Sequence, residues 1–465
     1  MAILSSSLGT VLVLVSLLVF SAIGLTAARR GFGRDSDRFL TARGTQAVWP
    51  LALNFLASVL GAWILFAPAE VGTFAGLLGI IGYALGQGIA IAIFAWLGPK
   101  IRQKLPEGTT VLQWVRRRFG EVVHTYVGAI SVLYMFVFLA AELTAVGGAV
   151  TLLSGTDRLI PIIGVALATA IYTAWGGLPA SLLTDRWQGS LILGLVTAVA
   201  VVVAVDIDSP GQRALEGGLT NTTQTGLEVL IVLIIAITAA NLFHQGFWQR
   251  VWAAKSDQVL RRGAILGGIL VIPVLFVLGL GGMIAAGGGE LEVPSLALFT
   301  LFDTMPRVVL ALIIVLAVTL VASSVDTLQN ALAALITIDV ARGKISVTGA
   351  RIVTLVLTIP AVILATEGVS VLRLFLIADL LAATIAIPVF LGLWKKATSA
   401  GTLAGCITGL IGIIAAGWIL DGTIIDGFKL ITLPNGAELA PFIAAPVGSF
   451  LASAVVALLR PGSRS

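Results

Sequence analysis

The sequence predicts an all-α polytopic membrane protein, and three observations support this prediction. Hydrophobic residues make up 58% of the 465 residues and charged residues only 11%, whereas soluble domains carry about 25% charged residues. The mean hydropathy is +1.07. Apolar segments that could cross a bilayer, which takes about 20 residues of helix, recur along the whole chain. We expect about 13 transmembrane helices from this pattern.

The first predicted span is a membrane helix rather than a signal peptide. It has no basic residue before it and Arg29, Arg30 and Arg34 after it, which is the reverse of a signal peptide's polarity. We therefore expect the N-terminus outside. The predicted spans are residues 8–28, 47–75, 76–97, 122–153, 159–175, 180–205, 227–249, 259–286, 307–340, 350–366, 369–393, 399–420 and 440–459.

The basic residues predict the orientation of the whole chain. With the N-terminus outside, 23 of the 28 Lys and Arg residues fall on the cytoplasmic side. The exceptions are Arg158, Arg213, Arg307, Arg373 and Lys429. This bias follows the positive-inside rule, so the C-terminus is expected in the cytoplasm. We expect a multi-pass integral protein of the plasma (inner) membrane, in contact with the lipid bilayer.

Composition also argues against several function classes. The segments between spans are too short to fold as domains, so we expect no enzyme or nucleotide-binding module and no nucleic-acid partner. Glycine runs at 279–282 and 287–289 neither follow a strand nor lead into a phosphate-binding helix. The single Cys406 cannot form an intramolecular disulfide, and two His residues are too few for a His-based metal site. No organic cofactor is expected, and the oligomeric state is left open.

The segment 318–339, VTLVASSVDTLQNALAALITID, carries a polar stripe inside an apolar span. At about 100° per residue, Ser323, Ser324 and Thr327 share one face, with Asp326 on its flank. Such a stripe must face other helices or a watery cavity, because a charge in lipid is costly. Hydroxyl and carboxylate oxygens suit small alkali cations, so we expect an ion site on this helix. The serines could instead only bond back to carbonyls of the preceding turn.

Two predicted spans carry polar or helix-weakening residues at mid-depth. Residues 54–63, NFLASVLGAW, are followed by Pro68, and residues 241–250 read NLFHQGFWQR. Interrupted helices at corresponding positions of two halves indicate the binding site of an inverted-repeat transporter. The third helix of each half then carries a buried acid, Glu142 or Asp326.

We expect the solute pocket to draw on polar and aromatic residues at this depth. The candidates are Trp63, Gln87, Glu142, His244, Gln245 and Asp379. Acids within the membrane are functional by default, but the tryptophans could be packing residues, and His244 with Gln245 could be a satisfied core pair. The pocket lacks an obvious Arg clamp, which favours a neutral, zwitterionic or cationic solute over a dianion.

Three motifs together resemble the sodium/solute symporter family. They are 172–188, YTAWGGLPASLLTDRWQ; 322–327, ASSVDT, with Thr337 and Asp339 after it; and 247–255, FWQRVWAAK. The resemblance covers about residues 10 to 395 and implies a LeuT-type fold, a five-plus-five inverted repeat with one helix before it and two after. The implied divisions are an N-terminal helix and basic loop (1–46), a first repeat (47–205), an extracellular loop (206–226), a second repeat (227–394) and two peripheral helices (395–465).

The resemblance also implies ion-binding residues. One sodium would be held by the carbonyls of Ala57, Leu60 and Leu320 and the hydroxyls of Ser323 and Ser324. A second cation, or a proton, would use Asp185, Asp326 and Thr327. The chain departs from the family pattern at Val59, where some members have an acid, and at Asp326, where Ser or Ala is usual.

These observations predict a transporter rather than an enzyme. We expect sodium-coupled symport of a small polar organic solute, such as an amino acid or urea, by alternating access. Proton-coupled symport through Glu142, Asp326 or Asp379 is the alternative within transport. A membrane sensor that binds the solute without net flux is the alternative from another class.

Overall fold

The structure, a computed structural model, describes residues 4–29, 36–303, 305–344, 346–422 and 439–459. Within these ranges the chain is helical, and it has no β-strand beyond an isolated bridge between Gln46 and Ala254. Eleven of the described helices are long and apolar enough to cross a membrane. Five basic residues lie outside the described residues: Arg30, Arg34, Lys429, Arg460 and Arg464.

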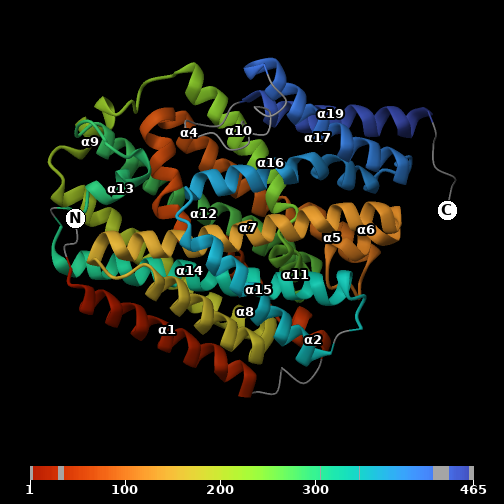
Figure 1. Cartoon of the computed structure of the whole chain (residues 1–465), viewed down its shortest axis with the longest axis horizontal. Helices are drawn as coiled ribbons and strands as arrows, with labels where there is room; N and C mark the ends of the chain where they lie inside the picture. Colours follow the sequence, from red (N-terminus) through yellow and green to blue (C-terminus); the bar gives the residue numbers. More distant parts are fainter. Residues whose placement is uncertain (1–3, 30–35, 304, 345, 423–438, 460–465) are drawn as a thin grey trace.

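The helices follow the predicted order along the chain (Figure 1). The longer ones are α1 (Ser6–Arg29), α3 (Val48–Val59), α4 (Ala67–Ala92), α5 (Phe94–Lys104), α6 (Val111–Phe119), α7 (Glu121–Ser154), α8 (Leu159–Asp206), α10 (Gln224–Asn241), α11 (Gln245–Ala253), α12 (Asp257–Ala286), α14 (Arg307–Leu335), α15 (Val347–Thr366), α16 (Val371–Phe390), α17 (Ser399–Asp421) and α19 (Leu439–Leu459). Short elements between them are α2 (Ser36–Thr41), η2 (Ala62–Leu65), α9 (Pro210–Glu216), η3 (Pro294–Leu296), α13 (Ala297–Thr300), the π-helical turn η4 (Ile336–Val340) and η5 (Leu391–Leu393).

Two glycines divide long helices into separate crossings. Gly76 in α4 has φ +60° and Gly177 in α8 has φ +62°, a left-handed conformation that favours glycine. The 48 residues of α8 would span about 72 Å as one straight helix, more than twice the hydrocarbon thickness. The breaks fall at the predicted boundaries between 47–75 and 76–97 and between 159–175 and 180–205. With α8 counted as two spans, and with α3, η2 and the first turns of α4 counted as one more, the eleven apolar helices correspond to the thirteen predicted spans.

Both predicted interruptions are present. Helix α3 ends at Val59, and the extended Leu60 (φ −83°, ψ 96°) and Gly61 separate it from η2. A side chain at position 61 would collide with the Glu142 carboxylate, so this close approach requires glycine. Helix α10 ends at Asn241, and α11 begins after the extended His244 (φ −69°, ψ 97°). Each break exposes backbone carbonyls and amides inside the bundle.

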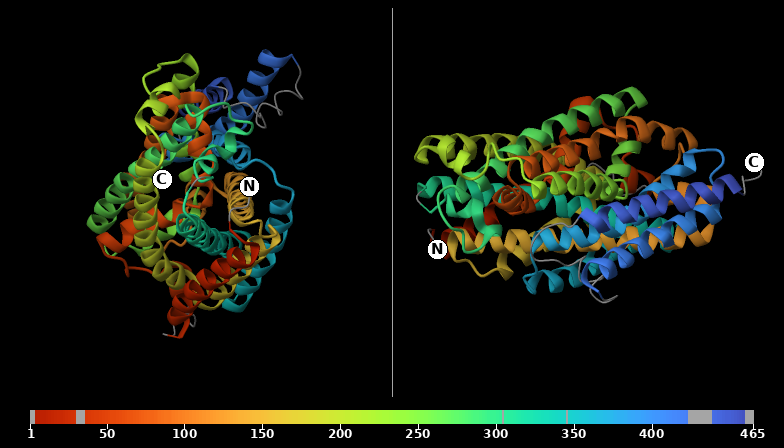
Figure 2. Two further views of the ribbon diagram at one scale, coloured as in Figure 1. Left: turned by 90° about the vertical axis from the view of Figure 1, so that its left-hand side faces the viewer. Right: turned by 90° about the horizontal axis from the view of Figure 1, so that it is seen from above.

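Helix α14 is the centre of the bundle. In the most apolar part of α14, 78% of the residues are buried, whereas the figure is 33% for α1, which lies at the edge. It packs against α3, α7, α8 and α15, while α17 and α19 pack mainly on each other and on α16. Figure 2 shows α17 and α19, in blue, along the outside of the bundle. The boundaries of the two repeats stay a prediction.

The two ends of the bundle differ. Figure 1 places α9 and α13 at one end, where α1 begins, and α5 and α6 at the other, where α19 ends. We call the first the outer end and the second the inner end, following the predicted orientation. Arg116, Arg117 and Arg118 lie in the last turn of α6 at the inner end, as the positive-inside rule requires.

Candidate functional site

The first interruption brings α3 and α14 together around oxygen atoms. The Ser323 hydroxyl donates to the Ala57 carbonyl over 2.8 Å, and the Ser324 hydroxyl lies 3.3 Å from the Leu320 carbonyl. Leu60, the first extended residue of the break, is fully buried like the others. The contact of Ser323 with Ala57 joins α14 to α3, whereas the Ser324 hydroxyl bonds back to its own helix, to Leu320 and also to the Val321 carbonyl at 3.2 Å, and Leu60 lies at the adjoining break. Carbonyls and hydroxyls are the ligands that a hard cation prefers.

Ser323 has a second partner, the carboxylate of Asp185, at 2.7 Å. A hydroxyl carries one proton, so Ser323 can donate to Ala57 or to Asp185 but not to both at once. A cation bound to the Ala57 carbonyl would direct that proton to Asp185. The ion site and Asp185 are therefore linked through a single hydroxyl.

Asp185 also forms a buried ion pair with Arg250, at 2.6 Å, and neither side chain is exposed. The guanidinium donates further to the backbone carbonyls of Asn54 and Gly246 and to the Thr327 hydroxyl, at 2.8–3.0 Å. Arg250 is among the 23 basic residues predicted on the cytoplasmic side, and this placement is wrong, because the side chain is fully buried. Helix α11 carries it into the core, where it joins both interrupted helices to α8 and α14.

Asp326 is held by three hydroxyl groups of α8. Tyr172 and Ser181 each donate over 2.6 Å and Thr184 over 3.1 Å. These donors lie on both sides of the break at Gly177, so the break shapes the cradle. The structure thus brings Asp185, Asp326 and Thr327 together, and Arg250 contacts Asp185 and Thr327 directly. Arg186 also lies within electrostatic range of Asp185, whereas Asp326 forms no ion pair with any described residue.

A chain of aromatic rings lies beside the first break. Trp63 of η2 stacks on Tyr83 of α4 with 5.4 Å between ring centroids, and meets Phe375 of α16 edge-on at 5.5 Å. Phe375 contacts Phe138 of α7 at 4.6 Å, and Phe138 contacts the His244 ring at 5.7 Å. The rings therefore connect α4, α7 and α16 with both interruptions.

Three of the predicted polar residues lie four positions after an aromatic residue of this chain of rings, and therefore one turn further along the same helix face. The pairs are Tyr83 with Gln87, Phe138 with Glu142, and Phe375 with Asp379. Tyr83, Phe138 and Phe375 were not singled out from the sequence. Their four-residue spacing from polar candidates was the available signal, but spacing alone does not tell which helices face one another.

The polar groups beside the rings lack partners. Among the described residues, both oxygens of Glu142, both ring nitrogens of His244 and the amide nitrogen of Gln87 are buried without a hydrogen bond. The Asp379 carboxylate, near the Tyr83 and Tyr134 rings, forms no ion pair or hydrogen bond within the described part of the chain. Buried polar atoms without partners are rare in native proteins. A bound solute would satisfy them.

Gln245 differs from the other candidates. Its amide donates to the Thr109 carbonyl at 2.7 Å and accepts from the Val111 amide at 3.3 Å. Both contacts hold α11 against the start of α6. This geometry favours a structural role for Gln245, whereas the remaining solute candidates lie around the ring chain.

The chain matches known proteins over nearly its whole length. The family model of the sodium:solute symporter family matches residues 39–409. A spermidine transporter of Candida albicans is 33% identical, over 99% of this chain and 91% of that protein. A urea-proton symporter of Oryza sativa subsp. japonica is 24% identical, over 92% of this chain and 66% of that protein. A sodium/glucose cotransporter of Vibrio parahaemolyticus is also 24% identical, with coverages of 85% and 82%.

Solved structures share the fold. A Na⁺-coupled sialic acid symporter in a substrate-bound outward-open state superposes with a TM-score of 0.79 at 18% identity, over 98% of this chain and 99% of that one. Mhp1, a nucleobase-cation-symport-1 family transporter in a closed conformation, gives 0.60 at 16% identity, with coverages of 91% and 95%. The predicted all-helical, LeuT-type fold is confirmed.

Proposed function

We propose that this chain, which belongs to the sodium:solute symporter family, imports a small organic cation together with sodium by alternating access. The observation that supports this best is the pair of unpartnered carboxylates, Glu142 and Asp379, beside a chain of aromatic rings. The proposal narrows the predicted class of small polar solutes to those that carry an ammonium or similar group.

The chemistry of the pocket favours a cation. Carboxylates attract an ammonium group, and the faces of Trp63 and Phe375 stabilise a cation when water is excluded. The nearest guanidinium on the broken helices, Arg250, is already paired with Asp185, so it does not provide a clamp for an anion. The similarity to a spermidine transporter supports the same class.

Sodium is the proposed coupling ion at Ala57, Leu60, Leu320, Ser323 and Ser324. The site offers carbonyl and hydroxyl oxygens between an interrupted helix and α14, so a cation there would hold α3 against α14. The family includes sodium-coupled relatives and, by the name of the rice protein, a proton-coupled one. Proton coupling through the Asp185–Arg250–Asp326 cluster is therefore kept as the second candidate.

The two ends of the bundle suggest how access alternates. At the inner end Arg43 donates to the Pro106 and Gly108 carbonyls, and Arg118 to the carbonyls of Gly392 and Ala397. These contacts join the segments of the inner end to one another. The outer end has a cavity that reaches Phe66, next to the first break. Sodium and solute would bind from that side, and each must raise the affinity for the other by the same factor.

Replacing Ser323 or Ser324 with alanine is expected to raise the sodium concentration for half-maximal uptake severalfold. Each variant removes one of five oxygen ligands, and no carboxylate lies in the set to compensate. Uptake into proteoliposomes at varied sodium measures the effect. Thr319→Val is the matched control, because that buried hydroxyl on α14 only bonds back to Val315.

An unchanged sodium dependence in both serine variants would contradict the sodium site. The same vesicles distinguish transport from sensing, since a sensor would bind the solute but show no counterflow.

A further inference from the structure

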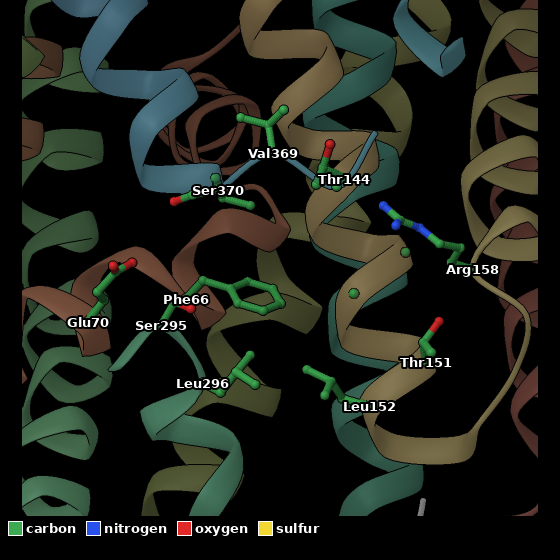
Figure 3. A pocket seen from close by; sticks show the side chains of 14 residues that line it. Phe66, Glu70, Thr144, Thr151, Leu152, Arg158, Ser295, Leu296, Val369 and Ser370 are labelled. Carbon is green, nitrogen blue, oxygen red and sulfur yellow. The ribbon is translucent and has the colours of Figure 1, made fainter. Parts of the chain in front are cut away.

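A separate cavity opens at the outer end, above the first interruption. Its volume is about 330 Å³, and it is lined by α4, α7, η3 and the loop before α16. Figure 3 shows Glu70 and Arg158 on opposite sides of it, with Phe66 between them. A cavity of this size fits a small organic molecule rather than water alone.

Glu70 is the one carboxylate of the cavity lining. It lies in the first turn of α4, and its side chain has no ion pair or hydrogen bond with any described residue. The hydroxyl groups of Thr144 and Ser370 also line the cavity. They could accept hydrogen bonds from an ammonium group that Glu70 attracts.

Arg158 does not neutralise Glu70. Its guanidinium donates to the Ala365 carbonyl at 2.9 Å and lies beside Gly368, on the other side of the cavity. The cavity therefore has an acidic side and a basic side. A cationic group would be directed to the Glu70 side, away from the guanidinium.

Phe66 lines this cavity and directly follows η2, the turn that carries Trp63 of the solute pocket, and its amide donates to the Trp63 carbonyl at 3.0 Å. Its ring packs on Phe299 at 4.9 Å and against Gly148 of α7. Tyr83, which stacks on Trp63 in the solute pocket, is within electrostatic range of both Asp379 and Glu70. Tyr83 therefore connects the Glu70 side of the outer cavity with the Asp379 side of the solute pocket.

We propose that the outer cavity is a second binding site for an organic amine, held by Glu70. This site rests on the proposed function, because the same kind of solute would bind at both places. The amine would donate to Glu70 and place its carbon chain on the Phe66 ring. Linear amines suit the site best, since their carbon chain can lie along the Phe66 ring while one ammonium group stays at Glu70.

The test is equilibrium binding of labelled spermidine to the full-length protein in nanodiscs, with sodium present. The wild type is expected to bind two molecules per chain, and Glu142→Gln or Glu70→Gln one. In Glu142→Gln protein, adding Glu70→Gln should weaken the remaining binding at least about tenfold, because a charge-assisted hydrogen bond is lost. Glu216→Gln, an exposed acid of α9, is the matched control.

Arg158→Gln tests whether the outer site prefers a positively charged ligand. For an amine at Glu70, removing the opposing positive charge should tighten binding at the outer site. Spermidine binding at the outer site that is unchanged or weaker in Arg158→Gln would overturn the proposal. Unchanged stoichiometry in Glu70→Gln would overturn the outer site alone, whereas a wild type that binds no amine would overturn the proposed solute class as well.

Discussion

Glu142→Gln is expected to abolish uptake of the organic amine while the protein remains folded. Glutamine has nearly the same shape, so it fits against Gly61, where the Glu142 carboxylate now lies. It lacks the negative charge, and losing a charge-assisted hydrogen bond should weaken amine binding roughly tenfold to a hundredfold. Direct binding and uptake, measured on the same preparation, would show this loss.

The Glu142 carboxylate lies against Gly61, at the break that adjoins Leu60 of the proposed sodium site, so sodium affinity should fall with amine affinity. Glu142→Asp is the matched control, because it keeps the charge and should retain part of the binding. A neutral solute would tolerate Glu142→Gln. Unchanged affinity in this variant would therefore contradict the cationic solute class.

Asp326→Asn is expected to remove one unit of charge coupling and to leave the first sodium site partly intact. The carboxylate accepts hydrogen bonds from Tyr172, Ser181 and Thr184, an arrangement that suits an anion. Arg250 contacts Asp185, and Arg186 lies within electrostatic range of the same carboxylate, whereas Asp326 forms no ion pair with any described residue, so Asp326 is where one more positive charge would be taken up. That charge would be a second sodium or a proton, since two close carboxylates do not both stay ionised unless a cation lies between them.

The charge-to-solute ratio in proteoliposomes measures this effect. It should be determined first with a sodium gradient and then with a pH gradient alone, because only a proton site responds to the second. Asp208→Asn, an exposed acid of the outer end, is the matched control. An equal ratio in wild type and Asp326→Asn under both gradients would make Asp326 a structural partner of α8.

Much of the fold follows from local sequence signals. Apolar segments with polar connections predicted the spans, and Gly76 and Gly177 break long helices at the predicted boundaries. Both interruptions were predicted because polar and helix-weakening residues occur at mid-depth in otherwise apolar spans. These features are local, so no knowledge of neighbouring helices was needed.

The partners within the site could not be predicted in the same way. Arg250 follows an interrupted helix in a segment with polar residues, so its sequence context resembles a cytoplasmic edge. Its burial depends on how α11 folds back between α3 and α14, which is a tertiary property. Gln245 is similar, because its bonds to Thr109 and Val111 join segments more than a hundred residues apart.

Amine accumulation in proteoliposomes tests the proposed transport most directly. Vesicles with the purified chain would receive labelled spermidine under an inward sodium gradient, and under a potassium gradient of equal size as the control. We predict accumulation above the external concentration with sodium, none with potassium, and collapse of the accumulation when the sodium gradient is dissipated. Equal accumulation with both ions would contradict sodium coupling, and failure to accumulate the amine while urea or a sugar is concentrated would contradict the cationic solute.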